Sequence, residues 1–267
     1  MEPKLLALRE ILRSHSPLLV AYSGGVDSAY LLAEAFDVLG PELVLGVIAD
    51  SPSLPRKALK DALAVAEQIG VPVEVVRTEE MANPSYAANP MNRCYFCKAE
   101  LFTQMNRLAG EGDFSALAYG ENADDATVLR PGSQAAAEFK VLAPLKEAGL
   151  TKSEIRQLSR KRGLPTADAP AQPCLSSRIP HGTPVTASAL RMVEPGEEWV
   201  RSLGFSVFRV RHIVEPETET CKARVQIAPE EMPQLARVKG SLEQGLVAVG
   251  YQTVEIDPEG YRAPSTK

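Results

Sequence analysis

The chain has 267 residues, of which 45% are apolar and 24% charged, and its formal net charge is −5. A chain of this length can bury one full core and still has room for a second, smaller domain. The composition is that of an ordinary globular protein. The acidic balance argues against a large nonspecific nucleic-acid surface, so we do not expect nucleic acid as a partner.

The sequence also argues against a membrane or secreted protein. Its longest apolar runs, such as 43–49, are strand-sized, whereas a membrane-spanning helix needs about 20 apolar residues. Residues 1–4 lack the basic start of a signal peptide, and no long apolar stretch follows them. We therefore expect a cytoplasmic protein with no membrane contact. Thiols stay reduced there, so the four cysteines are interpreted as metal ligands or catalytic groups.

Strand-sized apolar runs alternate with helical segments in the first half of the chain. We predict strands at 18–22, 43–49, 73–76 and 115–119, with a short fifth strand at 140–144. Helices are predicted at 29–39, 55–69 and 97–109, and a capping box at 151–154 opens another that ends at Lys161. Strands joined by crossover helices form a parallel sheet covered on both faces. The sequence therefore predicts an α/β, doubly wound parallel-sheet domain over residues 1–164.

The first strand-to-helix turn is the hexapeptide Ser23-Gly24-Gly25-Val26-Asp27-Ser28. Glycines let the backbone approach a phosphate, and the N–H groups that open a helix bind anions. Hydroxyls of Ser23 and Ser28 can add donors. No Gly-Lys-Ser/Thr follows, so this is not a Walker A loop. A tight turn without a ligand is the alternative interpretation.

The fourth predicted strand is followed by Gly120-Glu121-Asn122-Ala123-Asp124-Asp125. Ligands bind open α/β sheets at the carboxyl ends of the strands, so this turn should share a crevice with the turns at Ser23 and Asp50. Paired carboxylates beside a polyphosphate suit Mg²⁺. A solvated helix cap is the alternative, and the position in the strand order favours a functional site.

The alternating pattern stops in the stretch 165–184, which holds five prolines. We interpret 165–185 as an active-site loop and linker, because long loops in compact proteins are often functional. A helix is then predicted at 187–203, strands at 205–214 and 223–227, a helical stretch at 229–249 with a possible break at Gly240, and a strand at 252–256. This order predicts a smaller α+β domain over residues 186–267.

Cysteines occur at Cys94 and Cys97, three apart near the start of a predicted helix, and at Cys174 in the proline-rich loop. A helix N-terminus favours the thiolate, which is both a metal ligand and a nucleophile. Three interpretations compete: buried apolar cysteines, a structural zinc site with His181 as fourth ligand, or an iron–sulfur cluster held by three cysteines. We favour the cluster. Cys221 is interpreted as a residue of an insertion and not as a ligand.

The hexapeptide, Arg93-Cys-x-x-Cys-Lys98, Pro173-Cys-Leu-x-Ser-Arg178 and Arg209-Val-Arg-His212 together resemble the LarE family, over nearly the whole chain. This family consists of PP-loop sulfur transferases, with an ATP-pyrophosphatase (HUP-like) fold, that build the nickel-pincer nucleotide of lactate racemase. The resemblance implies ATP and Mg²⁺ as cofactors, a 4Fe–4S cluster on the three cysteines, and a homo-oligomer. It implies adenylation of a pyridinium biscarboxylate mononucleotide, followed by conversion to a thiocarboxylate.

The same resemblance implies roles for individual residues. The cysteine that some members sacrifice aligns with Cys174. The implied nucleotide-binding residues lie in the three turns and are Ser23, Gly24, Gly25, Asp27, Ser28, Ala49, Asn122, Asp124 and Asp125. Those expected to bind substrate lie in the last third of the chain and are Ser177, Arg178, Glu198, Arg209 and Arg211. We predict that Asp27 and Cys174 are the catalytic pair.

Two of the arginines can be placed by strand periodicity. Arg209 and Arg211 are two apart on a predicted strand, so they should share a face and could hold the substrate's phosphate. A solvated face paired with Glu215 or Glu217 is the alternative. The chain departs from the family at Glu121, which stands for Thr, at the insertion 215–222, and at Gln226, which stands for an acid. A PP-loop tRNA thiolase with a similar cluster is the alternative function.

Overall fold

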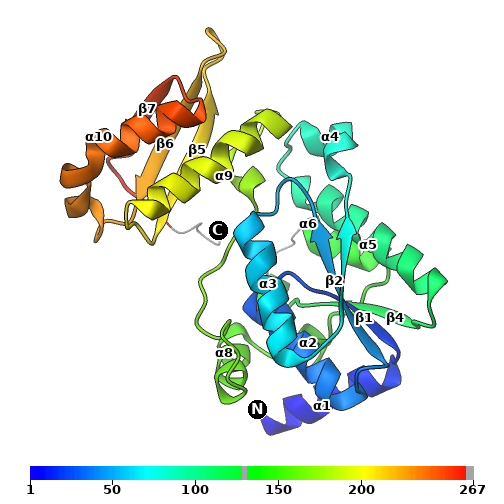
Figure 1. The fold of residues 1–267 in the computed structure, drawn as a ribbon. Helices are drawn as coiled ribbons and strands as arrows, with labels where there is room; N and C mark the ends of the chain where they lie inside the picture. Colours follow the sequence, from blue (N-terminus) through cyan, green and yellow to red (C-terminus); the bar gives the residue numbers. More distant parts are fainter. Residues whose placement is uncertain (128–130, 263–267) are drawn as a thin grey trace. The chain divides into compact units, whose positions relative to one another are not determined.

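The computed structural model describes residues 1–127 and 131–262. The chain divides into two compact units (Figure 1). The first contains Met1–Asn83 and Asn92–Gln172, and the second contains Pro84–Met91 and Pro173–Lys267. Each unit has its own sheet and its own apolar core. Within the described residues, no helix is both long enough and apolar enough to cross a membrane.

The sheet of the first unit confirms the predicted fold class. Its strands are β1 (Leu18–Ala21), β2 (Val44–Asp50), β3 (Val73–Arg77) and β4 (Ala116–Tyr119). They are all parallel and lie in the order β3-β2-β1-β4. The strand order reverses direction at β1, so the turn after β1 opens at the position where such sheets bind ligands.

Helices cover both faces of this sheet (Figure 1). They are α1 (Glu2–Ser14), α2 (Val26–Leu39), α3 (Arg56–Ile69), α5 (Arg93–Glu111), α6 (Pro131–Glu138), α7 (Pro144–Glu147) and α8 (Lys152–Lys161). Successive side chains of β1 point alternately to the two helical layers. Leu18 and Val20 pack in one buried cluster with Leu31 of α2, whereas Leu19 packs in another with Phe102 and Met105 of α5. Alternate side chains of one strand thus serve opposite cores.

Several element boundaries differ from the sequence predictions. The short fifth strand is an isolated parallel bridge between Ala118 and Leu142, because α7 begins at Pro144 and leaves no room for a longer ladder. Helix α5 begins at Arg93 rather than at Cys97, so both cysteines lie inside it. Helix α1 was not predicted at all.

The second unit is built on a smaller sheet. Its strands are β5 (Phe208–Val214), β6 (Cys221–Ile227) and β7 (Thr253–Ile256), in the order β5-β6-β7, with β5 antiparallel and β7 parallel to β6. Helices α9 (Ala187–Ser202) and α10 (Met232–Val249) share a buried core with it through Val200, Val210 and Leu246. Helix α10 runs unbroken through Gly240, so the possible break there does not occur.

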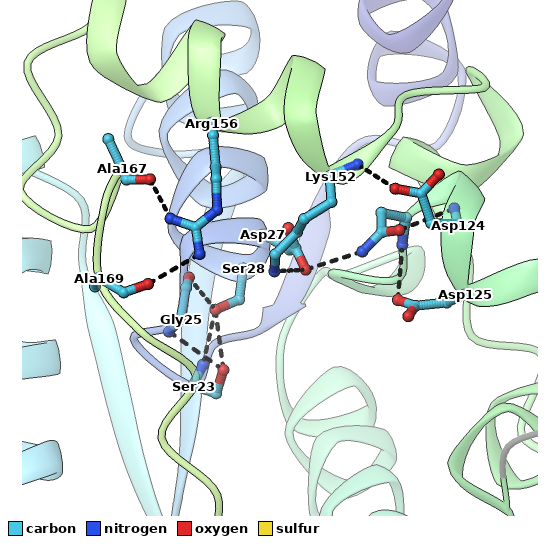
Figure 2. A network of polar contacts seen from close by, with 11 residues as sticks. Ser23, Gly25, Asp27, Ser28, Asp124, Asp125, Lys152, Arg156, Ala167 and Ala169 are labelled. Carbon is cyan, nitrogen blue, oxygen red and sulfur yellow. Dashed lines mark hydrogen bonds and ion pairs between the residues drawn. The ribbon is translucent and has the colours of Figure 1, made fainter. Parts of the chain in front are cut away.

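The proline-rich stretch is anchored at both of its ends. In the first unit, Arg156 of α8 donates hydrogen bonds to the carbonyl oxygens of Ala167 and Ala169, at 2.5 and 3.0 Å (Figure 2). In the second unit, the Asn89 amide donates to the carbonyl oxygens of Pro180 and Thr183, both at 2.8 Å. Asn89 follows the short helix α4 (Pro84–Ala87), so this contact ties residues 84–91 to the C-terminal part of the chain.

Candidate functional site

The loop after β1 is closed by its own side chains (Figure 2). The Ser28 hydroxyl donates to the Gly25 carbonyl at 3.0 Å and accepts from the Ser23 N–H at 3.2 Å. Gly24 has φ 74°, and a Cβ there would lie 2.7 Å from Cβ of Ala62. Glycine is therefore required both by the conformation and by the close approach of α3.

Asp27, in the first turn of α2, is the centre of a polar network in Figure 2. Its Oδ2 accepts from Lys152 Nζ at 2.7 Å and from Asn122 Nδ2 at 3.1 Å. Its Oδ1 is buried and has no hydrogen-bond partner among the described residues. A buried carboxylate oxygen without a donor is costly in an isolated protein, and it is the kind of oxygen that binds a hard cation.

The turn after β4 packs closely against this loop. A Cβ on Gly120 would lie 2.7 Å from the Ser28 nitrogen, so only glycine lets the end of β4 reach the start of α2. Asn122 Oδ1 accepts from the Asp124 N–H at 2.9 Å, and Asp125 Oδ2 accepts from the Asn122 N–H at 3.3 Å. These are turn-stabilising contacts, and the Asn122 side chain also reaches Asp27, so the cap and site interpretations are compatible.

Lys152 is a site residue that sequence reasoning missed. It is the first residue of α8, which opens with the predicted capping box of Thr151 and Glu154. Its N–H donates to Asp124 Oδ2 at 2.8 Å while its ammonium reaches Asp27. A capping box in the sequence predicts where a helix begins, but it does not predict which distant residue the side chains of its first turn contact. Ala49, the predicted adenine contact, lies half-buried near the carboxyl end of β2, beside Val76.

A second polar cluster surrounds Glu121, the residue that stands in place of Thr. Buried Glu121 accepts hydrogen bonds from the Tyr119 hydroxyl, from Ser133 Oγ at 2.5 Å and from Lys146 Nζ at 3.4 Å. Burial alone would raise the pKa of Glu121, but these hydrogen bonds and the Lys146 charge outweigh it and hold that pKa below its ordinary value. The carboxylate is therefore ionised and fully committed to neighbours.

The cysteines are divided between the two units. Cys94 and Cys97 lie three residues apart in the first turns of α5, so they share a helix face; the first is exposed and the second half-buried. Cys174 is half-buried at the start of a 3₁₀ turn (Leu175–Arg178) in the second unit. Within residues 1–127 and 131–262, no three His, Cys, Asp or Glu side chains form a metal-binding group. The three-cysteine cluster thus stays a prediction from sequence, as does the zinc alternative.

Arg178 organises the turn that carries Cys174. It forms a two-point ion pair with Glu197, with Nε to Oε1 at 2.8 Å and Nη2 to Oε2 at 2.9 Å. Its Nη1 donates to the carbonyl oxygens of Pro173 and Cys174, at 2.6 and 3.0 Å. The predicted Glu198 is exposed on α9, and its buried neighbour Glu197 makes this contact instead. Sequence reasoning missed Glu197.

Arg209 and Arg211 lie on the same face of β5, next to this turn. Arg211 donates to the Ser177 carbonyl at 2.8 Å and to Gln226 Oε1 at 3.1 Å, whereas the Arg209 guanidinium lies 5.2 Å from the centroid of the Tyr261 ring. Burial lowers the pKa of Arg211, and the positive charges of Arg209 and Arg178 lower it further. The arginines are therefore close enough to repel one another.

Glu215 and Glu217, the partners in the alternative interpretation, form no ion pair with these arginines within the described residues. Glu215 forms its ion pair with Lys222 at 2.5 Å. Gln226, which stands for the family's acid, takes a hydrogen bond from Arg211 and donates one to Asp257 Oδ2 at 2.8 Å, but it brings no negative charge of its own. The face of β5 thus keeps an excess of positive charge that suits an anion.

Comparison with known proteins agrees with this architecture. Residues 8–102 match the NAD synthase family. The uncharacterized protein slr1717 of Synechocystis is 43% identical over 265 residues, which cover 98% of this chain and 96% of that protein. The pyridinium-3,5-bisthiocarboxylic acid mononucleotide synthase of Lactiplantibacillus plantarum is 28% identical over 244 residues, covering 91% and 86%.

A third relative, the uncharacterized protein MJ0830 of Methanocaldococcus jannaschii, is 24% identical over 266 residues, which cover 97% of this chain and 98% of that protein. These matches extend across both structural units. The similarity to the Lactiplantibacillus synthase supports the resemblance to the LarE family, and the chain belongs to the family of slr1717.

Proposed function

We propose that this chain uses ATP to adenylate a carboxylate of a pyridinium biscarboxylate mononucleotide and then converts that carboxylate to a thiocarboxylate. One observation carries the proposal: the similarity, over 91% of this chain, to an enzyme named for making the corresponding bisthiocarboxylic acid. The structural features of each unit supply the groups that such a reaction needs.

The adenylation step would use the loop after β1. A carboxylate oxygen attacks the α-phosphorus of ATP, the bond from that phosphorus to the bridging oxygen breaks, and pyrophosphate leaves with the electron pair. The N–H groups that open α2, with the Ser23 and Ser28 hydroxyls, are donors for the departing pyrophosphate. The buried Oδ1 of Asp27 and the Asp124 carboxylate fit Mg²⁺, which would neutralise charge building on the phosphates.

The sulfur step would use the cysteines. A sulfur nucleophile adds to the acyl carbon of the adenylate, and AMP leaves with the carboxylate oxygen, so the product is a thiocarboxylate. Cys94 and Cys97 share a helix face, and in the part of the chain that the structure describes neither they nor Cys174 forms a disulfide, which fits the thiolate ligands that iron–sulfur clusters require. A 4Fe–4S cluster on these residues would supply sulfide as the nucleophile.

Substrate binding would use the second unit. The substrate is an anion that has to be held near another anion, ATP, so fixed positive charge is needed. Arg209 and Arg211 share a strand face, and Arg178 is held beside Cys174 by Glu197. Guanidinium groups match phosphate oxygens in pairs, which fixes orientation as well as charge.

The decisive experiment is a product analysis. The purified protein, incubated with Mg-ATP and pyridinium-3,5-biscarboxylic acid mononucleotide, should form AMP and pyrophosphate in equal amounts, and only when that substrate is present. Formation of ADP and phosphate would contradict the proposal. Pyrophosphate release that depends on unmodified tRNA, and not on the mononucleotide, would establish the alternative of a tRNA thiolase.

A further inference from the structure

Lys98 is a cation that the proposed reaction has not yet used. It lies in the second turn of α5, one residue after Cys97 and four after Cys94, so it shares a helix face with Cys94. Its ammonium lies 4.2 Å from the centroid of the Tyr119 ring. None of the hydrogen bonds or ion pairs within residues 1–127 and 131–262 includes this ammonium. With respect to these described residues, its donors are therefore available to a ligand.

The fold holds Lys98 in this place. A Cβ on Gly132 of α6 would lie 2.8 Å from Cδ of Lys98 and 3.2 Å from Nζ, so any larger residue there would displace the side chain. The Tyr119 ring offers its face to the cation, and its hydroxyl is fixed by Glu121. Glu121 itself is committed to Ser133 and Lys146, so it does not form an ion pair with Lys98.

Within the first unit, Lys98 lies near the groups proposed for both steps, the cysteine pair and the turn after β4. Tyr119 is the last residue of β4, three residues before Asn122, which contacts Asp27. The carboxylates of Glu121 and Asp125 and the thiols of Cys94 and Cys97 are near enough to act on the Lys98 charge. Lys98 thus stands between the cysteine pair and the turn that reaches the nucleotide loop.

We propose that Lys98 binds the substrate carboxylate that is to be adenylated and orients it toward the α-phosphorus of ATP. This proposal rests on the proposed function. An ammonium beside the attacking carboxylate would offset its repulsion from the phosphates. Because Cys94 shares the face of α5 with Lys98, the activated acyl carbon would form beside the sulfur-bearing end of the helix. Tyr119 and Glu121 are then positioning residues for Lys98.

The test compares Lys98→Met, Lys98→Arg and, as a matched control, Lys161→Met at the exposed end of α8. In Lys98→Met, the KM for the biscarboxylate mononucleotide should rise about tenfold or more, as expected when a charge-assisted contact is lost. The KM for ATP should stay within about twofold. Lys98→Arg should recover most of the substrate affinity, and Lys161→Met should match the wild type. A rise in the KM for ATP alone would assign the ammonium to a phosphate and overturn the proposal.

A direct binding measurement tests the role of Lys98 without requiring the enzyme to turn over. Calorimetry with nicotinate mononucleotide and nicotinamide mononucleotide probes a carboxylate against the matched carboxamide. The wild type should prefer the carboxylate, and Lys98→Met should lose most of that preference while keeping its melting temperature. Equal preference in both proteins would overturn the role of Lys98, whether or not the wild type releases pyrophosphate. Absence of pyrophosphate release in the wild type would instead count against the proposed function.

Discussion

The ammonium of Lys152 lies 2.7 Å from Oδ2 of Asp27, although the two residues are 125 positions apart in the chain. The contact joins the first residue of α8 to the first turn of α2 (Figure 2). Because the same Oδ2 also accepts from Asn122, three loops meet at one carboxylate. The helix that opens with Lys152 is therefore part of the proposed nucleotide site as well as a cover for the sheet.

Asp27→Ala should abolish pyrophosphate release while the protein stays folded. The change removes the carboxylate whose buried Oδ1 is available to a cation. Lys152 is left without its partner but remains partly exposed, at 42% of its side chain, so water can solvate it. A pyrophosphate-release assay and a thermal melt check the two halves of this prediction. The exposed Asp113→Ala serves as control, and retained pyrophosphate release in Asp27→Ala would remove Asp27 from the mechanism.

Lys152→Met should weaken ATP binding about tenfold with little change in stability. In the nucleotide-free protein the ammonium neutralises Asp27, and phosphate oxygens of ATP offer it a stronger partner. Half-exposed ion pairs contribute only about 0–1 kcal/mol to folding, so the melting temperature should hardly move. Titration with a nonhydrolysable ATP analogue measures the affinity. An unchanged affinity would mean that the contact with Asp27 is purely structural.

The cysteine series tests the predicted cluster. Anaerobically reconstituted protein should contain iron and sulfide and absorb as a 4Fe–4S protein. Single changes to Ala at Cys94, Cys97 or Cys174 should bleach that absorption. Cys221→Ala should leave it unchanged, since Cys221 is half-buried at the start of β6 and was assigned to an insertion. Full activity in protein that holds zinc and no iron would rule the cluster out.

The stability of the second unit should fall as the pH drops below about 6.5, the ordinary pKa of histidine. Burial lowers the pKa of His212, so between the folded and unfolded values the unfolded chain binds more protons and stability rises with pH. The slope from one histidine is at most about 1.4 kcal/mol per pH unit. Fluorescence of the single tryptophan, Trp199 on α9, reports the unfolding of this unit in denaturant.

His212→Phe provides the comparison for that titration. Phe keeps the ring that packs against Tyr251, with centroids 5.6 Å apart in the wild type, and removes the titrating group. The pH slope below about 6.5 should be smaller in this variant, whereas His15→Gln in the first unit should leave it unchanged. A slope identical in wild type and His212→Phe would show that another group is responsible.

Local sequence pattern was enough to predict the sheet and most helices, because strand alternation and helix caps depend on residues that are close together in the sequence. The helical periodicity of α9 could also have predicted Glu197, which lies on the same buried face as Val193 and Val200. Glu198 is one residue further along and so lies off that face. Helical periodicity could also have predicted α1, where Leu8 and Leu12 are buried four apart. Lys152 could not be predicted in this way, since its partner is set by how α8 packs.

Arg211→Gln should raise the KM for the mononucleotide strongly and leave the KM for ATP nearly unchanged. Arg211 is held by the Ser177 carbonyl and by Gln226, which carries no charge, so its own charge remains available to an anion. Loss of an Arg–phosphate contact should cost on the order of 1.5–3 kcal/mol, or roughly ten- to a hundredfold in affinity. Arg209→Gln should act in the same direction because both arginines share one face of β5.

Gln226→Glu provides an independent check on the same charge. A carboxylate at this position would pair with Arg211, whose Nε lies 3.1 Å from Gln226 Oε1 in the present structure, and would compete with the substrate's phosphate. The mononucleotide KM should therefore rise in Gln226→Glu, although no arginine has been removed. Steady-state kinetics at constant ionic strength, together with a thermal melt, separate this effect from unfolding. If Arg209→Gln, Arg211→Gln and Gln226→Glu all keep the wild-type KM, the phosphate is not bound on this face of β5.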